Sequence, residues 1–298
     1  MHPRVLGSSG LTLATLLVGW SGFVPREGPV SLSAETLAAA AAGSPRQAAP
    51  DGITLTVLYD NMWPSDAFET GWGFSVLVET PGHTVLFDTG GDGDALLTNM
   101  RRLGKDPAAV EAVVFSHAHG DHVGGFEAIL DLGLRPTVYV PEGFRASVRD
   151  NFARTTDVVV TDEGREIVPG VRVTGRVGTG IAEQALIVET GAGPLVLTGC
   201  SHPGVLAMVD QAKRLTGGPV TRVMGGFHLG SASVGELERL ADELRARGVT
   251  RVGPSHCSGM EAARVFQDAY GEGFVRLGVG TVLRYRPANE GPGGHDPA

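Results

Sequence analysis

Three histidines and one aspartate stand within six residues, directly after a short apolar run. The run 111–115 predicts a buried strand, and His117-Ala-His119-Gly-Asp121-His122 follows it. Imidazole nitrogen and carboxylate oxygen are ligands that zinc, iron and manganese accept. Two histidines spaced i, i+2 on a loop can face one ion, while Asp121 and His122 turn toward a second. The motif therefore predicts a site for one or two zinc-type ions.

The competing interpretation of this motif is a polar loop of solvated histidines. It is the weaker one, because four potential ligands rarely stand together directly after a buried strand by chance. A bound divalent ion lowers the pKa of its water toward ~7 and polarises the oxygen that the water attacks. Asp121 could accept the proton of that water. The sequence contains no G-x-S-x-G or Walker-type loop, so the nucleophile is expected to be the water itself.

Four further candidates lie in the second half of the chain: Cys200, His202, His228 and His256. His228 and His256 each stand at the C-terminal end of a predicted strand, where the sites of layered α/β folds gather. His228 is either a ligand or a general acid that contacts the substrate, and its residue type alone does not decide between these roles.

The run His-x-His-x-Asp-His resembles the signature of the metallo-β-lactamase superfamily, and Leu86-Phe-Asp88-Thr-Gly90 resembles its earlier aspartate motif. The resemblance implies that the first two histidines bind one metal ion, and that Asp121 and His122 bind the second. It also implies that His256 is the last ligand of the second ion and that Asp88 orients the ligand loop. The alternative for Asp88 is an ordinary aspartate in a turn at the end of a strand.

Most of residues 53–285 is similar to the dihydropteroate-synthase-like branch of that superfamily, which is named for a methanopterin-pathway enzyme. The similar segments are 73–79, 183–186, 196–204, 225–229 and 254–259. Most members of this branch are known simply as metallo-hydrolases, so the branch name implies little about the substrate.

The second half departs from the common superfamily pattern. Glu183-Gln184 stands near the position of an expected histidine, and Cys200 stands where an aspartate commonly bridges both ions. Cys200 is a ligand, a small core residue, or one half of a disulfide with Cys257. His202 is a ligand or a substrate contact. These alternatives leave open whether one or two ions bind.

The strand and helix patterns predict a mixed α/β fold. Apolar runs predict strands at 53–58, 74–79, 84–87, 111–115, 137–140, 157–160, 171–174, 185–189, 194–198, 220–224, 249–252, 274–277 and 281–285. Helical spacing predicts helices at 92–103, 126–132, 205–215, 234–247 and 262–270. Each half runs from paired strands to alternating strands and helices. This pattern predicts a four-layer αββα sandwich of two mixed sheets with helices outside, as the metallo-β-lactamase resemblance implies.

The ends of the chain differ in composition from this domain. Residues 1–24 contain a basic start and the apolar run 11–20, as in a signal peptide; an N-terminal anchor and a buried helix are the alternatives. Residues 25–52 predict a flexible linker, 53–286 the folded domain and 287–298 a disordered tail. A secreted, periplasmic or cell-surface protein is therefore expected, with no stable membrane partner beyond a possible anchor.

The expected activity is that of an exported hydrolase acting on a small molecule that contains an ester, lactone, amide or phosphodiester. The alternatives are a synthase that joins a pterin diphosphate to an aryl amine, and a non-catalytic metal- or ligand-binding protein. The cofactor is Zn²⁺, with iron or manganese as alternatives. A formal net charge of −9 and the lack of a basic cluster argue against a nucleic-acid partner.

The N-terminal pattern makes a direct prediction about the mature protein. Intact-mass spectrometry of protein from the culture fluid or periplasm should show cleavage between Gly22 and Gln47. An intact cytosolic chain that begins at Met1 would contradict export and would favour the pterin-type alternative.

Overall fold

The computed structural model describes residues 52–288. The predicted signal or anchor segment, 1–24, lies outside the described residues, as do nearly all of the predicted linker and tail. Within the described range, no helix combines the length and the apolar character that crossing a membrane requires.

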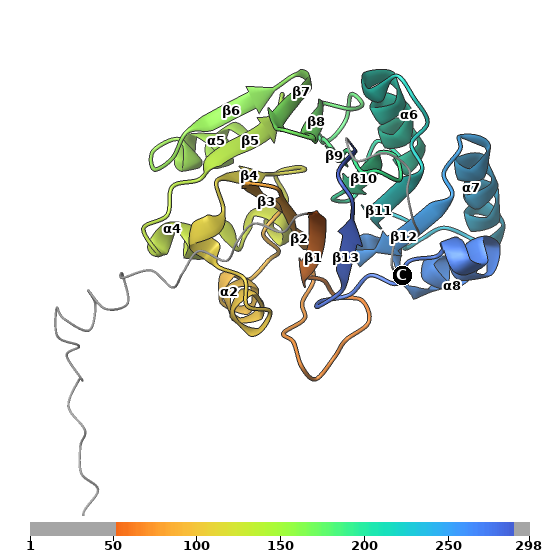
Figure 1. Ribbon diagram of the computed structural model, residues 1–298, viewed down its shortest axis with the longest axis horizontal. Helices are drawn as coiled ribbons and strands as arrows, with labels where there is room; N and C mark the ends of the chain where they lie inside the picture. The colour runs from red at the N-terminus through yellow and green to blue at the C-terminus, as the bar shows by residue number, and fades with distance from the viewer. Residues whose placement is uncertain (1–51, 289–298) are drawn as a thin grey trace, which may run out of the picture. The chain divides into compact units, whose positions relative to one another are not determined.

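The first sheet has seven strands in the order β13-β1-β2-β3-β4-β5-β6 (Figure 1). The strands are β1 (Ile53–Tyr59), β2 (Ser75–Thr80), β3 (His83–Phe87), β4 (Ala112–Val114), β5 (Thr137–Pro141), β6 (Val158–Thr161) and β13 (Val282–Tyr285). Pairing is antiparallel from β13 to β3 and parallel from β3 to β6. The sheet is therefore mixed, as predicted.

The second sheet has six strands in the order β12-β11-β10-β9-β8-β7. The strands are β7 (Glu163–Val168), β8 (Val171–Gly175), β9 (Leu186–Val188), β10 (Leu195–Thr198), β11 (Arg222–Gly226) and β12 (Arg251–Ser255). The predicted hairpin of residues 185–198 is confirmed, because β9 and β10 pair antiparallel. Strands β10, β11 and β12 pair in parallel, so this sheet is mixed as well.

Helices cover the outer face of each sheet (Figure 1). The helices are α2 (Gly93–Arg102), α4 (Phe126–Asp131) and α5 (Ala146–Phe152) on the first sheet, and α6 (Val205–Thr216), α7 (Val234–Ala246) and α8 (Met260–Tyr270) on the second. Three apolar clusters fill the spaces between the layers. One lies between the two sheets, and one lies under each set of helices. The predicted four-layer αββα sandwich is thus confirmed.

The parallel strands place the candidate ligands at one edge of the sandwich. His117 follows β4, Cys200 and His202 follow β10, His228 follows β11, and His256 directly follows β12. These strands are almost entirely buried, which is typical of parallel strands beneath helices. Residues that follow β10, β11 and β12 lie at one edge of the second sheet, and the stacking of the two sheets brings the segment after β4 beside them.

The structure differs from the sequence-based expectation at four elements. Strand β7 and helix α5 were not predicted, because β7 carries charged, largely exposed residues and α5 is only seven residues long. The predicted strand 274–277 forms only an isolated bridge between Phe274 and Val252. Its apolar residues pack into the core instead, where Leu277 is buried between the sheets. The metal motif, expected as a loop, contains the short helix α3 (Gly120–Val123).

Glycine allows the strand ends near the motif to approach each other closely. A Cβ atom on Gly226, the last residue of β11, would overlap the carbonyl oxygen of Gly199 and lie 2.8 Å from Cys257 Sγ. Neither neighbour is the free end of a flexible side chain, so a methyl group there would push the two strand ends apart.

Gly226→Ala should therefore destabilise the protein by about 2 kcal/mol, the middle of the range for overpacking a tight interior. Gly218→Ala is the matched control, because a Cβ at that turn position would meet nothing within 4 Å. Urea unfolding of both variants measures the difference. Equal free energies of unfolding for the two variants would contradict the close approach at Gly226.

Candidate metal centre

A first cluster of histidines consists of His117, His119 and His202. Their potential ligand atoms all lie within 4.8 Å of one another. His117 Nε2 lies 3.0 Å from His119 Nδ1, and the ring of His202 lies 4.7 Å from that of His117. The motif after β4 thus meets the turn after β10, and the three nitrogens lie close enough together to bind one ion.

A buried glutamate holds His202 in this position. Glu183 Oε2 accepts hydrogen bonds from His202 Nδ1 and from the His202 backbone N–H, both at 2.8 Å. Glu183 Oε1 accepts from the backbone N–H groups of Cys200 and Ser201. Burial raises the pKa of Glu183, but these donors outweigh it and lower the pKa to about 2. The ionised carboxylate shapes the whole turn and leaves His202 Nε2 free to bind a metal.

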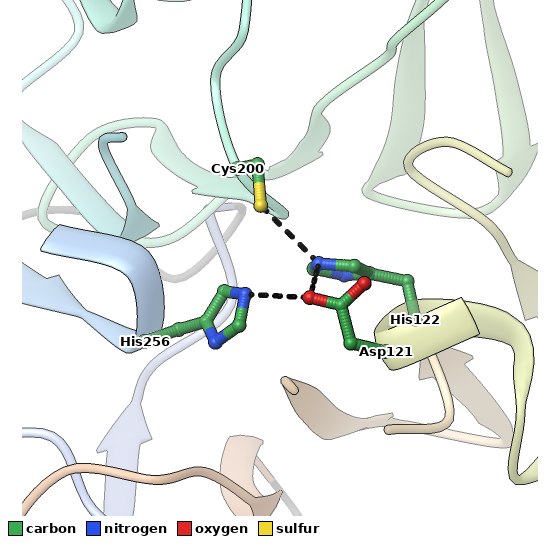
Figure 2. Close-up of side chains that lie close together, drawn as sticks. All are labelled: Asp121, His122, Cys200 and His256. Atoms are coloured by element: carbon green, nitrogen blue, oxygen red, sulfur yellow. Dashed lines mark hydrogen bonds and ion pairs between the residues drawn. The ribbon is translucent and has the colours of Figure 1, made fainter. Parts of the chain in front are cut away.

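A second cluster consists of Asp121, His122, Cys200 and His256, whose potential ligand atoms also lie within 4.8 Å of one another. Figure 2 shows the four side chains pointing toward one another, with the Asp121 carboxylate beside both imidazoles. Asp121 Oδ2 lies 3.3 Å from His256 Nε2 and 3.6 Å from His122 Nε2. Cys200 Sγ lies 3.3 Å from His122 Nε2. This donor set of nitrogen, oxygen and sulfur is one that zinc accepts.

Asp88 orients one ligand of each cluster. Its Oδ2 atom accepts from His122 Nδ1 at 2.7 Å and from Ser116 Oγ at 2.7 Å. Ser116 Oγ in turn lies 2.9 Å from His117 Nδ1. Because the Ser116 hydroxyl donates its hydrogen bond to Asp88, its oxygen accepts a hydrogen bond from His117 Nδ1–H. Both histidines therefore carry their proton on Nδ1 and present an unprotonated Nε2 to the centre.

Asn61, on the loop after β1, orients His256 in the same way. Asn61 Oδ1 lies 2.8 Å from His256 Nδ1, and Asn61 Nδ2 donates to the His256 carbonyl oxygen at 3.3 Å. The opposite nitrogen, His256 Nε2, is buried and makes no hydrogen bond within residues 52–288, although Asp121 Oδ2 lies 3.3 Å away. A buried unsatisfied nitrogen is costly, and a metal ion between it and Asp121 would satisfy it.

The protonation states of three candidate ligands also favour metal binding. Burial lowers the pKa of His117 and His119, and it lowers the pKa of His122 to about 3. These side chains are therefore neutral at physiological pH, which is the form of histidine that binds metal ions. The residues present thus fit two divalent ions, one held by each cluster. This division matches the one that the resemblance in sequence implies.

His228 lies at the margin of the centre. It is exposed, its ring lies 4.6 Å from that of His202, and it forms a third potential group with Cys200 and His202. This position is compatible with both expected roles, as a ligand and as a contact for the substrate. His228, Asp88 and His256 all have positive φ, as Ser201 does. Strained backbone of this kind concentrates at functional sites.

The two cysteines are not bonded to each other. Both are free and buried, and the Cys257 thiol donates to the Cys200 carbonyl oxygen at 3.7 Å. Of the three alternatives for Cys200, the disulfide is therefore absent from the structure, and the thiol faces the second cluster.

Sequence reasoning did not assign a role to Glu183 or Asn61. Glu183 was noticed only because it stands near an expected histidine. The structure shows that it supports the turn from which His202 reaches the first cluster. Asn61 follows a strand without any motif, and no feature of the sequence connects it to His256, 195 residues away.

Glu183→Gln should weaken metal binding by roughly 10- to 100-fold, the usual effect of losing an outer partner of a ligand. The glutamine side chain has no negative charge, and its NH₂ group would face the four groups that donate hydrogen bonds to Glu183. Glu163→Gln, at an exposed position of β7, is the control. Competition with a chromophoric chelator measures the affinity. Wild-type affinity in Glu183→Gln would show that His202 does not depend on this carboxylate.

Comparison with known proteins places this centre in a family. A model of the metallo-beta-lactamase superfamily matches residues 71–256, more than half of the chain. The chain is 25% identical over 286 residues to the 7,8-dihydropterin-6-methyl-4-(beta-D-ribofuranosyl)-aminobenzene-5'-phosphate synthase of Methanocaldococcus jannaschii, with 79% of this chain and 97% of that enzyme covered.

Solved structures are similar over the same range. A metal-dependent hydrolase of the beta-lactamase superfamily is 27% identical, with a TM-score of 0.67 and coverage of 78% of this chain and 98% of that chain. The metallo-beta-lactamase fold protein YhfI from Bacillus subtilis is 15% identical with a TM-score of 0.55, over 78% of this chain and 99% of that chain, and shares the fold. The chain therefore belongs to the metallo-β-lactamase superfamily.

Proposed function

We propose that this protein is a metal-dependent hydrolase of small molecules that contain an ester, lactone, amide or phosphodiester. The observation that carries the proposal is the pair of facing ligand clusters, in which buried His256 Nε2 makes no hydrogen bond within residues 52–288 and lies 3.3 Å from the Asp121 carboxylate. The 27% identical solved relative, described as a metal-dependent hydrolase, supports the same reaction class.

The residues of the two clusters divide the work of hydrolysis. His117, His119 and His202 would hold one ion, and Asp121, His122, Cys200 and His256 the other. The ions, when bound, lower the pKa of water and polarise the oxygen of the scissile group. The Asp121 side chain is 21% exposed, unlike the fully buried side chains of His122 and His256. It can therefore reach the water and accept its proton.

His228 is the candidate for the opposite proton transfer. It is exposed next to His202 and can contact the leaving group of a substrate held at the centre. Glu183 and Asp88 lie behind the ligands and take no proton in this scheme. They keep the imidazoles in the neutral tautomers that ligation needs.

A synthase is the second candidate, because one specific observation favours it. The M. jannaschii relative carries the name of a synthase, and the similarity covers 97% of its length. Such a reaction would join two substrates at the same ligand clusters and would release, for example, diphosphate instead of consuming water.

We also propose that the protein is exported, on the N-terminal sequence alone.

His119→Ala should remove at least one equivalent of metal and lower hydrolysis by more than the roughly 100-fold that loss of an outer partner causes. Asp121→Asn should lose turnover while it keeps the fold, because the amide accepts no proton. His83→Ala is the matched control, since His83 pairs with Glu111 away from the centre. Elemental analysis and a panel of ester, lactone, amide and phosphodiester substrates measure both quantities.

Two results would contradict the hydrolase proposal. Wild-type metal content and turnover in His119→Ala would show that the centre is assigned wrongly. A fully metal-loaded wild type that hydrolyses none of the panel, yet joins a pterin diphosphate to an aryl amine, would establish the synthase instead.

A further inference from the structure

An exposed tryptophan borders the second ligand cluster. Trp72 is the most exposed large apolar side chain of the described residues, at 61%. Its ring centroid lies 4.8 Å from that of His256, with the two planes tilted by 55°. His256 itself is buried, so the exposed indole places apolar surface beside the second ligand cluster.

The backbone on both sides of Trp72 is tightly held. A Cβ atom on Gly71 would overlap the Tyr59 hydroxyl, and one on Gly73 would overlap the carbonyl oxygen of Asp121. Gly71 N–H donates to the Asp60 carbonyl oxygen at 3.3 Å. The sequence Gly-Trp-Gly is therefore packed directly against the ligand motif, which places Trp72 at a defined point.

The loop that carries Trp72 is anchored to two ligands of the same cluster. Its beginning contacts His256 through Asn61, and at its end Phe74 N–H donates to the Asp121 carbonyl oxygen at 3.4 Å. Asp60, at the base of the loop, accepts a hydrogen bond from Ser255, the residue before His256. The indole is thus positioned by the same contacts that position Asp121 and His256.

The chemistry of the indole indicates what it contacts. Its π-face favours planar aromatic partners in stacked or tilted arrangements. Within residues 52–288 its Nε1 atom donates to no acceptor in the protein, so a ligand can accept from it. Small-molecule sites commonly combine aromatic walls with a few converging polar groups, and the ligand clusters supply those groups here.

We propose that Trp72 is a wall of the substrate site and stacks on a planar aromatic or heteroaromatic group next to the bond that is hydrolysed. The inference rests on the proposed function and narrows its substrate class. It selects aryl and heteroaryl compounds from the esters, lactones, amides and phosphodiesters. Trp72 is here a specificity residue, because it contacts the substrate without taking part in proton transfer.

Two phosphonates test this directly by binding to the metal-loaded, full-length protein. Phenylphosphonate and methylphosphonate present the same anionic group and differ only in the ring. Trp72→Ala should weaken phenylphosphonate binding by about 5- to 10-fold, as loss of an aromatic pair does, and leave methylphosphonate unchanged. Trp72→Phe should keep most of the phenylphosphonate affinity. Isothermal titration gives both dissociation constants, and elemental analysis confirms equal metal content.

Leu132→Ala is the matched control, because Leu132 is a similarly exposed apolar residue, at 54%, directly after α4. If Trp72→Ala binds both phosphonates as the wild type does, the inference is overturned and the hydrolase proposal stands. Equal weakening of both ligands would also overturn it, because Trp72 would then only support the ligand loops. If the wild type binds neither phosphonate and hydrolyses none of the substrate panel, both proposals fail together.

Discussion

The ligand clusters depend on two buried carboxylates that fix imidazoles from behind. Asp88 binds His122 directly and His117 through Ser116, and so it orients one ligand of each cluster. Glu183 holds His202 and three consecutive backbone N–H groups of the turn after β10. A histidine whose Nδ1–H is held by an acceptor must present Nε2 on its opposite side. The direction of these hydrogen bonds therefore determines where metal ions can bind.

The same edge of the sandwich contains much of the strain in the structure. Four of its residues have positive φ without being glycine: Asp88, Ser201, His228 and His256. Gly199 packs so closely that a Cβ atom would overlap Ser116 Oγ and lie 3.0 Å from Asp88 Oδ2. Buried charges, a buried nitrogen without a hydrogen bond and strained backbone all reduce stability. The apolar layers between and outside the sheets offset this cost, and metal binding would reduce it further.

The superfamily membership and the geometry of the ligand clusters narrow the type of reaction more than they narrow the identity of the substrate. Both clusters lie among residues that the two halves of the fold contribute jointly, and this architecture serves many metal-dependent reactions. In this chain Cys200 faces His122, Glu183 holds His202, and one loop carries both Asn61 and Trp72. Cysteine at this place offers one sulfur where a carboxylate could offer two oxygens, so the second cluster has a mixed donor set that fits a borderline ion.

The sequence by itself determined the metal motif, the layered fold and the candidate ligands at the strand ends. It could do so because His117, His119, Asp121 and His122 are close in the chain, and because hydrophobic periodicity reports local structure. It left Cys200 between ligand, core residue and disulfide, and it missed Asn61 and the role of Glu183. Those depend on contacts between residues that are far apart in the chain, such as Asn61 with His256. Only the stacking of two sheets brings such residues together, since no local pattern encodes which loops meet at their common edge.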